Sequence, residues 1–252
     1  MKHPRFFDIH SHLNDRAFDP DRAEAVSRLQ EKDTWTITVG TDREMSQKAC
    51  DSTQMAEGIY AAIGMHPVDN TQEVFDLGFY RSLAEGNKKV VAIGECGLDY
   101  FRVPAEKRDA EKKRQEALFE AQIELAVSLD LPLMIHCRDA HQDALAMLES
   151  KKRTYGDALR GDVHFFAENI ETAKRYFDLG FTISFTGVLT FASQYNEVVA
   201  YAPLTHIMSE TDAPYVAPVP YRGGRCEPWH VEEVVKKIAE IRKEPLLNQP
   251  MQ

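Results

Sequence analysis

Short apolar segments alternate with amphipathic stretches along the chain, and this alternation limits the fold more than any other feature of the sequence. The segments are rich in β-branched, aromatic and other apolar residues, as strands buried on both faces of a parallel sheet are. Eight strands, each followed by a connection that contains a helix, predict an α/β fold of the (β/α)8 TIM-barrel type. The expected strands are Phe6–His10, Trp35–Gly40, Ile59–Gly64, Val90–Gly94, Pro132–His136, Asp162–Phe165, Phe181–Phe185 and His206–Glu210.

Capping residues indicate where several of the intervening helices begin and end. Asp19, which stands before a proline, predicts the start of the first helix. Asn169 predicts the start of a later helix, which Gly180 ends before the next strand. A helical stripe of apolar residues in Glu111–Leu129 predicts a longer helix.

One domain is expected over residues 1–252, because this length fits one barrel and no linker divides the chain. Two connections are distinctive: the charged stretch Phe101–Arg114 and the Pro/Gly-rich stretch Ala213–Pro228. Both follow strands. In a barrel they are therefore expected on the face where active sites form.

Composition restricts the function classes. The formal net charge is −10, so no protein-wide positive field attracts polyanions, and any contact with nucleic acid must be local. The four cysteines (Cys50, Cys96, Cys137 and Cys226) form no C-x-x-C motif, which argues against a zinc ribbon, a redox pair or a secreted disulfide framework. Neither a signal peptide nor a membrane-spanning stretch is recognised. A cytoplasmic protein is expected, with no membrane contact and no obligate protein partner.

Residues that bind metals gather at the ends of the predicted strands. His10 and His12 end the first strand and lie on the same face, because side chains of a strand alternate. Strand ends converge on one site in a barrel. Four histidines and two carboxylates are too many for one tetrahedral zinc ion and suit a two-metal site, with Glu95 as the expected bridge. The full set is His10, His12, Glu95, His136, His164 and Asp212.

Neighbouring residues agree with this orientation. Asp8 lies two residues before His10 and is expected to face inward as a support for the ligands. Glu210 stands in the same relation to Asp212, deeper in the barrel. Cys96 and Cys137 are expected to point outward, toward the helices.

The motifs in this order resemble the TatD family of metal-dependent deoxyribonucleases, which belongs to the amidohydrolase superfamily of TIM-barrel hydrolases. The resemblance runs from about Phe6 to about Arg242. It rests on Asp8-Ile9-His10-Ser11-His12, Gly64-Met65-His66-Pro67, Gly94-Glu95-Cys96-Gly97-Leu98-Asp99-Tyr100, His136-Cys137-Arg138, His164, Phe185-Thr186-Gly187 and Glu210-Thr211-Asp212-Ala213-Pro214.

The resemblance implies two divalent metal ions per chain. One ion would be held by His10, His12, Glu95 and Asp212, and the other by Glu95, His136 and His164. A mixed shell of this kind is compatible with zinc, manganese, cobalt, nickel or iron, whereas magnesium usually prefers oxygen donors. The choice among zinc, manganese, magnesium, cobalt, nickel and iron stays open.

Two departures from the family pattern concern the end of the chain. Relatives usually have Arg-Asn-Glu-Pro where this chain has Arg225-Cys226-Glu227-Pro228. Loss of that asparagine is expected to affect substrate positioning more than metal binding. The chain also stops at Leu246–Gln252, where relatives continue into a final helix, so the C-terminal helix is expected to be shortened and one side of the barrel less covered.

The ligand set indicates the chemistry. Two cations held together polarise a phosphoryl oxygen and activate a water molecule. Glu95 is expected to act as the bridge. Asp212 is the candidate that accepts the proton of the water and passes it to the leaving oxygen.

Substrate contacts are predicted around this centre. His66 is either a turn residue or a substrate contact. Most of the basic run that begins at Arg102 reads as the solvated start of a helix, with Arg102 itself as the exception. Tyr100, Phe101 and Tyr221 either stack on bases or pack near the barrel mouth. The candidate contacts are His66, Arg102, Arg138, Arg222 and Arg225, the arginines as phosphate partners.

Hydrolysis of DNA phosphodiester bonds is therefore expected, of the 3'-5' exonuclease type, with single-stranded DNA or DNA ends as the substrate. The first alternative keeps the binuclear site but hydrolyses a carboxylic ester, an amide or an aminoacyl-tRNA ester. The second is a catalytically silent barrel used for binding, in which the six residues are only buried hydrogen-bonding groups. Burying so many charges without a cation is costly, which disfavours the second alternative.

Overall fold

The strands and helices follow one another in the order of a (β/α)8 barrel. The computed structural model describes residues 3–245. The strands are β1 (Phe6–Ser11), β2 (Thr34–Val39), β3 (Ile59–Ile63), β4 (Val90–Asp99), β5 (Leu133–Arg138), β6 (Gly161–Val163), β7 (Thr182–Phe185) and β8 (Ile207–Ser209). The helices are α1 (Arg22–Glu31), α2 (Arg43–Ser52), α3 (Leu77–Gly86), α4 (Arg108–Ser128), α5 (His141–Tyr155), α6 (Ile170–Asp178), α7 (Asn196–Tyr201) and α8 (Val231–Arg242), and short 3-10 turns link several of them.

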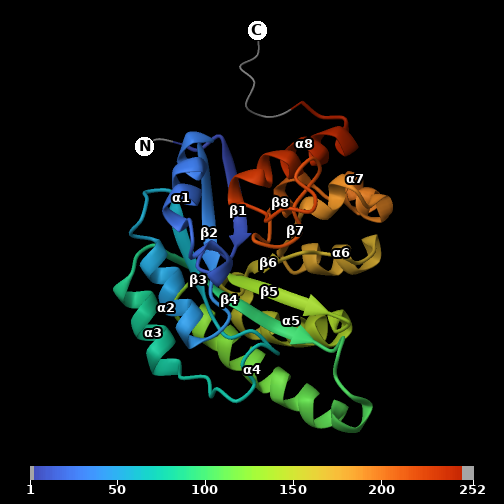
Figure 1. Ribbon diagram of the computed structural model, residues 1–252. Helices are drawn as coiled ribbons and strands as arrows, with labels where there is room; N and C mark the ends of the chain where they lie inside the picture. Colours follow the sequence, from blue (N-terminus) through green and yellow to red (C-terminus); the bar gives the residue numbers. More distant parts are fainter. Residues whose placement is uncertain (1–2, 246–252) are drawn as a thin grey trace.

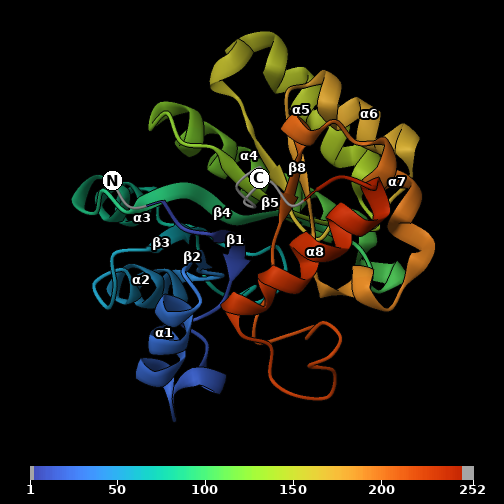
Figure 2. The same cartoon turned by 90° about the horizontal axis from the view of Figure 1, so that it is seen from above.

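All eight strands are parallel neighbours in chain order, which confirms the predicted fold class. The helices surround the strands, with α1 to α3 on one side and α6 to α8 on the other (Figures 1 and 2). Among the described residues, β8 forms no ladder with β1, and one bridge between Ser11 and Ala213 joins the two ends of the sheet. The barrel is therefore nearly closed, and its closing contact lies beside the metal-binding motifs of β1 and of the segment after β8.

The strand β4 is longer than predicted. It continues through Glu95 to Asp99 because Gly97, Leu98 and Asp99 pair with His136, Cys137 and Arg138 of β5. Glu95 thus lies within a strand instead of at its end.

The first helix begins later than predicted. Asp19 ends a 3-10 turn (Arg16–Phe18) that Asp15 caps, and α1 starts after Asp21. The later helix starts where expected: the Asn169 side chain accepts a hydrogen bond from the Thr172 amide at 2.9 Å. Gly180 follows the end of that helix with a φ of +77°.

The charged connection is mostly helical. Only its first residues form a loop, since a 3-10 turn (Ala105–Lys107) leads directly into α4. Basic residues of α4 pair with acidic neighbours, Lys112 with Asp143 and Arg114 with Glu111, as a solvated helix start requires. The expectation of a shortened C-terminal helix concerns Leu246–Gln252 and lies outside the described residues.

The barrel interior below the site contains buried polar residues that are joined by hydrogen bonds. The Asp8 carboxylate accepts hydrogen bonds from the Thr36 hydroxyl and from both the amide and the hydroxyl of Thr211, at 2.8–3.1 Å. Asp8 therefore ties β1 to the segment that carries Asp212. Asp162 accepts hydrogen bonds from Thr182 and Ser184 at 2.6 Å, and burial raises the pKa of its carboxyl to about 7.

Apolar side chains fill the space between the strands and the helices. Cys96 is buried there, and Cys137 packs against the same cluster, as the outward orientation predicted for both requires. No helix in residues 3–245 is long and apolar enough to cross a membrane.

Candidate metal centre

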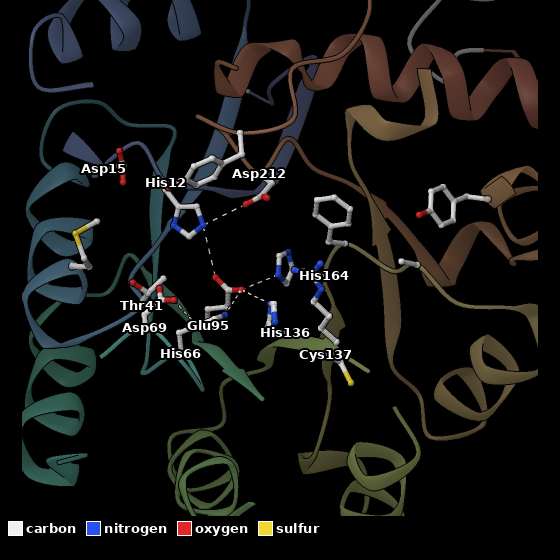
Figure 3. A pocket seen from close by; sticks show the side chains of 16 residues that line it. His12, Asp15, Thr41, His66, Asp69, Glu95, His136, Cys137, His164 and Asp212 are labelled. Atoms are coloured by element: carbon white, nitrogen blue, oxygen red, sulfur yellow. Dashed lines mark ion pairs between the residues drawn. The ribbon is translucent and has the colours of Figure 1, made fainter. Parts of the chain in front are cut away.

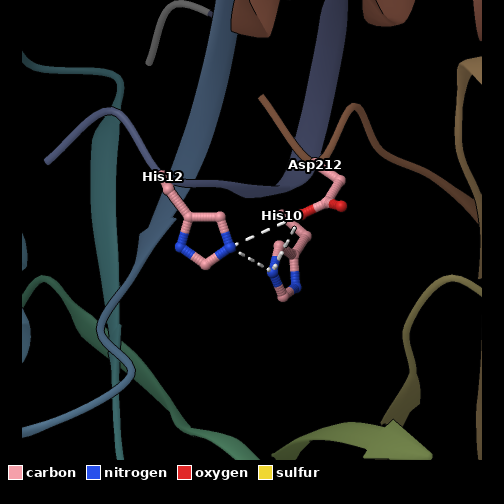
Figure 4. Close-up of side chains that lie close together, drawn as sticks. All are labelled: His10, His12 and Asp212. Carbon is pink, nitrogen blue, oxygen red and sulfur yellow. Dashed lines mark hydrogen bonds and ion pairs between the residues drawn. The ribbon is translucent and has the colours of Figure 1, made fainter. Parts of the chain in front are cut away.

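The end of β1 presents two imidazoles to one carboxylate. The Nε2 atoms of His10 and His12 lie 3.2 Å apart, and both approach Oδ1 of Asp212, at 3.9 and 3.4 Å (Figure 4). The Nδ1–H group of His12 donates to the Val39 carbonyl at 3.0 Å, which orients the ring so that Nε2 faces the cluster. Bridging of the Ser11 and Ala213 backbones holds the two segments in place.

Glu95 lies at the centre of the cluster and divides it into two halves. Its Oε2 atom faces Nε2 of His10 at 3.5 Å and Nε2 of His12 at 3.7 Å. Its Oε1 atom faces Nδ1 of His136 at 3.0 Å and Nε2 of His164 at 2.9 Å (Figure 3). Nε2 of His66 also approaches Oε1, at 3.6 Å. Each carboxylate oxygen therefore faces its own group of histidines, an arrangement that suits a bridging ligand.

His136 is oriented by a carboxylate of the neighbouring strand. Its Nε2 atom lies 3.0 Å from Oδ2 of Asp99, at the end of β4. Because Asp99 holds one ring nitrogen, the other nitrogen faces Glu95. Asp99 entered the sequence analysis only as part of a motif, and its contact with His136 depends on the extension of β4.

The donor set fits divalent cations. Both ring nitrogens of the buried His164 lack a hydrogen-bond partner among the described residues, although Nε2 lies next to Glu95 and Nδ1 lies 3.6 Å from Glu210. Buried polar atoms are normally satisfied, so nitrogens left in this way point to a missing partner. Three triads of candidate ligand atoms each fall within 4.8 Å: His10, His12 and Asp212; His10, Glu95 and His164; His66, Glu95 and His136.

The protein groups by themselves keep the carboxylates ionised. Burial raises the pKa of Glu95, but the charges of His164 and His66 and the hydrogen bonds from His10 and His136 outweigh it and hold the pKa well below its usual range. Burial likewise raises the pKa of Asp212, and contacts with His12 lower it below its usual range.

The histidines respond to the same charges. Burial opposes the charged form of His12, yet its hydrogen bond to Asp212 and the charge of Glu95 raise its pKa to about 9. Burial and the neighbouring His164 lower the pKa of His10. An electrostatic field that favours positive charge between two ionised carboxylates also favours a bound cation.

Five of the six predicted ligands form the floor of a cavity of about 650 Å³, whereas His10 is fully buried beneath them and does not line it. His66 belongs to this floor, with its Nε2 atom 3.6 Å from Glu95 and its Nδ1 atom 2.9 Å from Asp69. It is therefore closer to the metal ligands than a rim contact. Aromatic side chains of Phe165, Tyr195 and Tyr215 also line the cavity and were not predicted as substrate contacts.

The predicted arginine contacts separate into two groups. Arg138 lines the cavity. Arg102, Arg222 and Arg225 are absent from the described residues that line it. The guanidinium of Arg222 stacks on the Phe191 ring, with 3.9 Å from its central carbon to the ring centroid.

Side chains of the loop before α8 contact other residues of the protein. Arg225 forms ion pairs with Asp21 and Glu227, which also pairs with Arg28 of α1. Cys226 is fully buried in the apolar cluster that contains Leu13 and Phe18. The expected effect of Cys226 on the rim is therefore not supported, because its side chain faces this cluster. Tyr100 is buried, and the partly buried Tyr221 stacks on His230, so both pack against the protein.

A nearly closed parallel barrel whose strand ends gather histidines and carboxylates in one cavity defines a metal-dependent hydrolase. The family model described as TatD related DNase matches residues 7–248. The chain belongs to the TatD family.

Individual relatives agree with this assignment. An uncharacterized metal-dependent hydrolase of Bacillus subtilis, YabD, is 38% identical over 94% of this chain and 91% of its own length. A protein of Cronobacter sakazakii named 3'-5' ssDNA/RNA exonuclease TatD is 35% identical over 94% of this chain and 90% of its own length. The crystal structure of the TatD homologue YjjV from Escherichia coli is 29% identical, with a TM-score of 0.84 over 97% of this chain and 93% of that one.

Proposed function

We propose that this hydrolase cleaves phosphodiester bonds in single-stranded DNA and removes nucleotides from the 3' end. The observation that carries the proposal is the position of Glu95, which lines the cavity and whose two oxygens face separate groups of histidines. A similar relative is named as a 3'-5' ssDNA/RNA exonuclease, which supports this choice of substrate.

Two divalent ions are the expected cofactors. His10, His12, Glu95 and Asp212 would hold one ion, and Glu95, His136 and His164 the other. When bound, the ions supply Lewis-acid activation of the phosphoryl group and of a water molecule. Asp99 and Asp8 position these ligands, the first through His136 and the second through the Thr211 segment.

Asp212 is the proposed proton carrier. Its side chain lines the cavity and is 15% exposed, so it reaches the reacting atoms, and its contacts with His12 keep its carboxylate ionised. An ionised carboxylate at this position accepts a proton from the attacking water and returns it to the leaving oxygen.

The cavity suits one terminal nucleotide. Its volume of about 650 Å³ is that of a small-molecule pocket and not of a groove that admits a duplex. Arg138 and His66 offer donors to the phosphate. Tyr215 and Phe165 offer flat surfaces for the base, since stacking on aromatic side chains tolerates any base.

The decisive test is incubation of the protein with 5'-labelled single-stranded DNA and a panel of manganese, magnesium, zinc, cobalt, nickel and iron salts. We expect shortening from the 3' end with release of mononucleotides. Oligonucleotides blocked at the 3' end by an inverted nucleotide should resist degradation. Turnover of a carboxylic ester or an aminoacyl ester without release of nucleotides would reject the proposal, and so would the absence of any hydrolysis.

A further inference from the structure

A second cavity of about 520 Å³ adjoins the cavity of the metal centre. The loop after β4 and the start of α4 form most of its wall. Arg138 lines both cavities and connects them. Its lining includes Asp99, Phe101, Arg102, Lys107, Glu111 and Arg138.

Three cations face this second cavity, and one of them, Lys107, interacts with the charge of Glu111. Among the described residues, Arg102, Lys107 and Arg138 form no ion pair, in a chain that carries a net charge of −10. The two carboxylates of the lining are already engaged. Asp99 contacts His136, and Glu111 pairs with Arg114 and accepts a hydrogen bond from Gln115. The positive charge of the wall is therefore available to an external anion.

The loop also holds Arg138 in a defined position. The amide of Phe101 donates to Oδ1 of Asp99 at 2.9 Å, which fixes the loop to the carboxylate that orients His136. The guanidinium of Arg138 stacks on the Phe101 ring, with 3.6 Å from its central carbon to the ring centroid. A stacked guanidinium keeps its N–H edge free, and that edge binds phosphate in a bidentate manner.

Resting on the proposed function, we infer that the second cavity binds the backbone phosphate of the nucleotide next to the one being removed. Arg138 would contact the phosphate of the bond being cleaved. Arg102 and Lys107 would contact the next phosphate along the strand. The ligand class is a single-stranded polynucleotide of three or more residues. The cavity of the metal centre has room for one terminal nucleotide only. The second cavity would therefore explain why the protein recognises a polynucleotide and not a single nucleotide.

The test measures binding of fluorescein-labelled, phosphorothioate-linked oligothymidylates of two, four and eight nucleotides by anisotropy, with the metal-loaded protein. We expect affinity to increase from two to four nucleotides. Arg102→Ala and Lys107→Ala should each weaken binding of the four-nucleotide strand about tenfold, as loss of one charged hydrogen bond does. Each should also reduce the dependence of log affinity on log salt by about 0.7, the value for one phosphate contact to a single strand.

Lys113→Ala is the matched control, because this exposed lysine of α4 lies outside both cavities and its loss changes the net charge equally. It should bind like the unmodified protein. Equal affinity for all lengths, or unchanged binding by the Arg102 and Lys107 variants, would overturn the inference.

Hydrolysis of bis(4-nitrophenyl) phosphate, which is too small to occupy both cavities, separates the two proposals. If the protein hydrolyses this diester but binds all strand lengths equally, the second cavity is not a phosphate site and the proposed chemistry stands. If no diester is hydrolysed but binding depends on length and on Arg102, the polynucleotide site stands and the nuclease proposal fails.

Discussion

Side chains of the candidate centre are held in position by contacts at both of their polar atoms, the two ring nitrogens of a histidine or the two oxygens of a carboxylate. Val39 orients His12, Asp99 orients His136, and Glu95 receives both halves of the cluster. Replacement of a residue that orients a metal-binding side chain should therefore shift that side chain but leave it in the centre. Removal of Glu95 should affect both halves at once.

If the proposed function holds, Glu95→Ala should lower hydrolysis of a phosphodiester at least about 1000-fold, because loss of the proposed bridging carboxylate removes the Lewis-acid contribution of several kcal/mol. It should also reduce the metal content of the purified protein. Glu24→Ala, an exposed glutamate of α1, is the control and should retain both properties. An active Glu95→Ala protein would contradict the bridging role.

The metal-binding residues of the candidate centre could be predicted from the sequence, but several of the residues that orient them could not. The spacing of His10 and His12 places them on one face of a strand whatever the rest of the chain does. The contacts of Asp99 with His136 and of Asp69 with His66 depend on the length of β4 and on the loop after β3. Such contacts arise from tertiary geometry, which no local spacing encodes.

At the scale of the elements, the approach of β4 to β5 depends on a glycine. Gly97 has a φ of +135°, and a Cβ atom there would lie 2.0 Å from the carbonyl oxygen of His136. The two strands could not keep this spacing with any other residue. The glycine therefore fixes Glu95 and Asp99 relative to His136.

Gly97→Ala should lower the free energy of unfolding by at least about 2 kcal/mol, through strain at positive φ and overpacking against β5. Chemical denaturation monitored by circular dichroism measures the change. Gly86→Ala is the matched control, because a Cβ atom at this position of α3 meets nothing within 4 Å and alanine favours helices. Equal stability of the two variants would refute the close approach.

Burial of His141 at the start of α5 predicts a dependence of stability on pH. Burial lowers its pKa to about 4, and its Nδ1 atom lies 2.9 Å from the Tyr176 hydroxyl of α6. Between pH 6.5 and 4 the unfolded chain binds a proton that the folded protein does not, so stability falls as the pH falls through this range. Each pH unit costs at most about 1.4 kcal/mol.

His141→Gln should remove about 2 kcal/mol of the stability loss between pH 7 and pH 5, as measured by urea unfolding at both values. His206→Gln, at a less buried position, serves as the reference and should keep the full loss. An identical loss in all three proteins would show that His141 does not titrate in this range on unfolding.

Most elements could be predicted because their apolar periodicity is local, whereas two boundaries could not. The segment Gly94-Glu95-Cys96-Gly97 interrupts the apolar pattern of β4, yet pairing with β5 resumes at Cys96 after a register shift that follows Ile93. Asp19 stands before a proline, as the residue that caps a helix often does. In the structure it ends a 3-10 turn, and Asp21 is the residue that precedes α1. In both cases tertiary contacts outweigh the local preference.

At the scale of the whole molecule, a polar interior and a candidate metal centre replace the usual apolar barrel core at one end. The carboxyl groups of Asp8, Asp162 and Glu210 are buried below the histidines, and such groups are compatible with folding only near hydrogen-bond donors or cations. Bound ions should therefore contribute to stability as well as to catalysis. The fold class was predictable from the order of strands and helices, but the single bridge that joins β1 to the segment after β8 was not, because it is a tertiary contact between residues far apart in the chain.

Chelation should lower the melting temperature. A ligand present at about 100 times its dissociation constant stabilises a folded protein by about 2.7 kcal/mol, which corresponds to roughly 5–10 °C for a chain of this size. Differential scanning fluorimetry with and without a chelator measures the shift, and added manganese should reverse it. An unchanged melting temperature would mean that no ion is bound in the folded state.

The proposed binuclear centre requires two metal ions per chain. Mass spectrometry of protein purified without chelators, after equilibration with manganese and removal of free ions, gives this number. Two ions in the unmodified protein, with fewer in Glu95→Ala, are predicted from the division of the ligands around Glu95. One ion or none in the unmodified protein would contradict the binuclear centre.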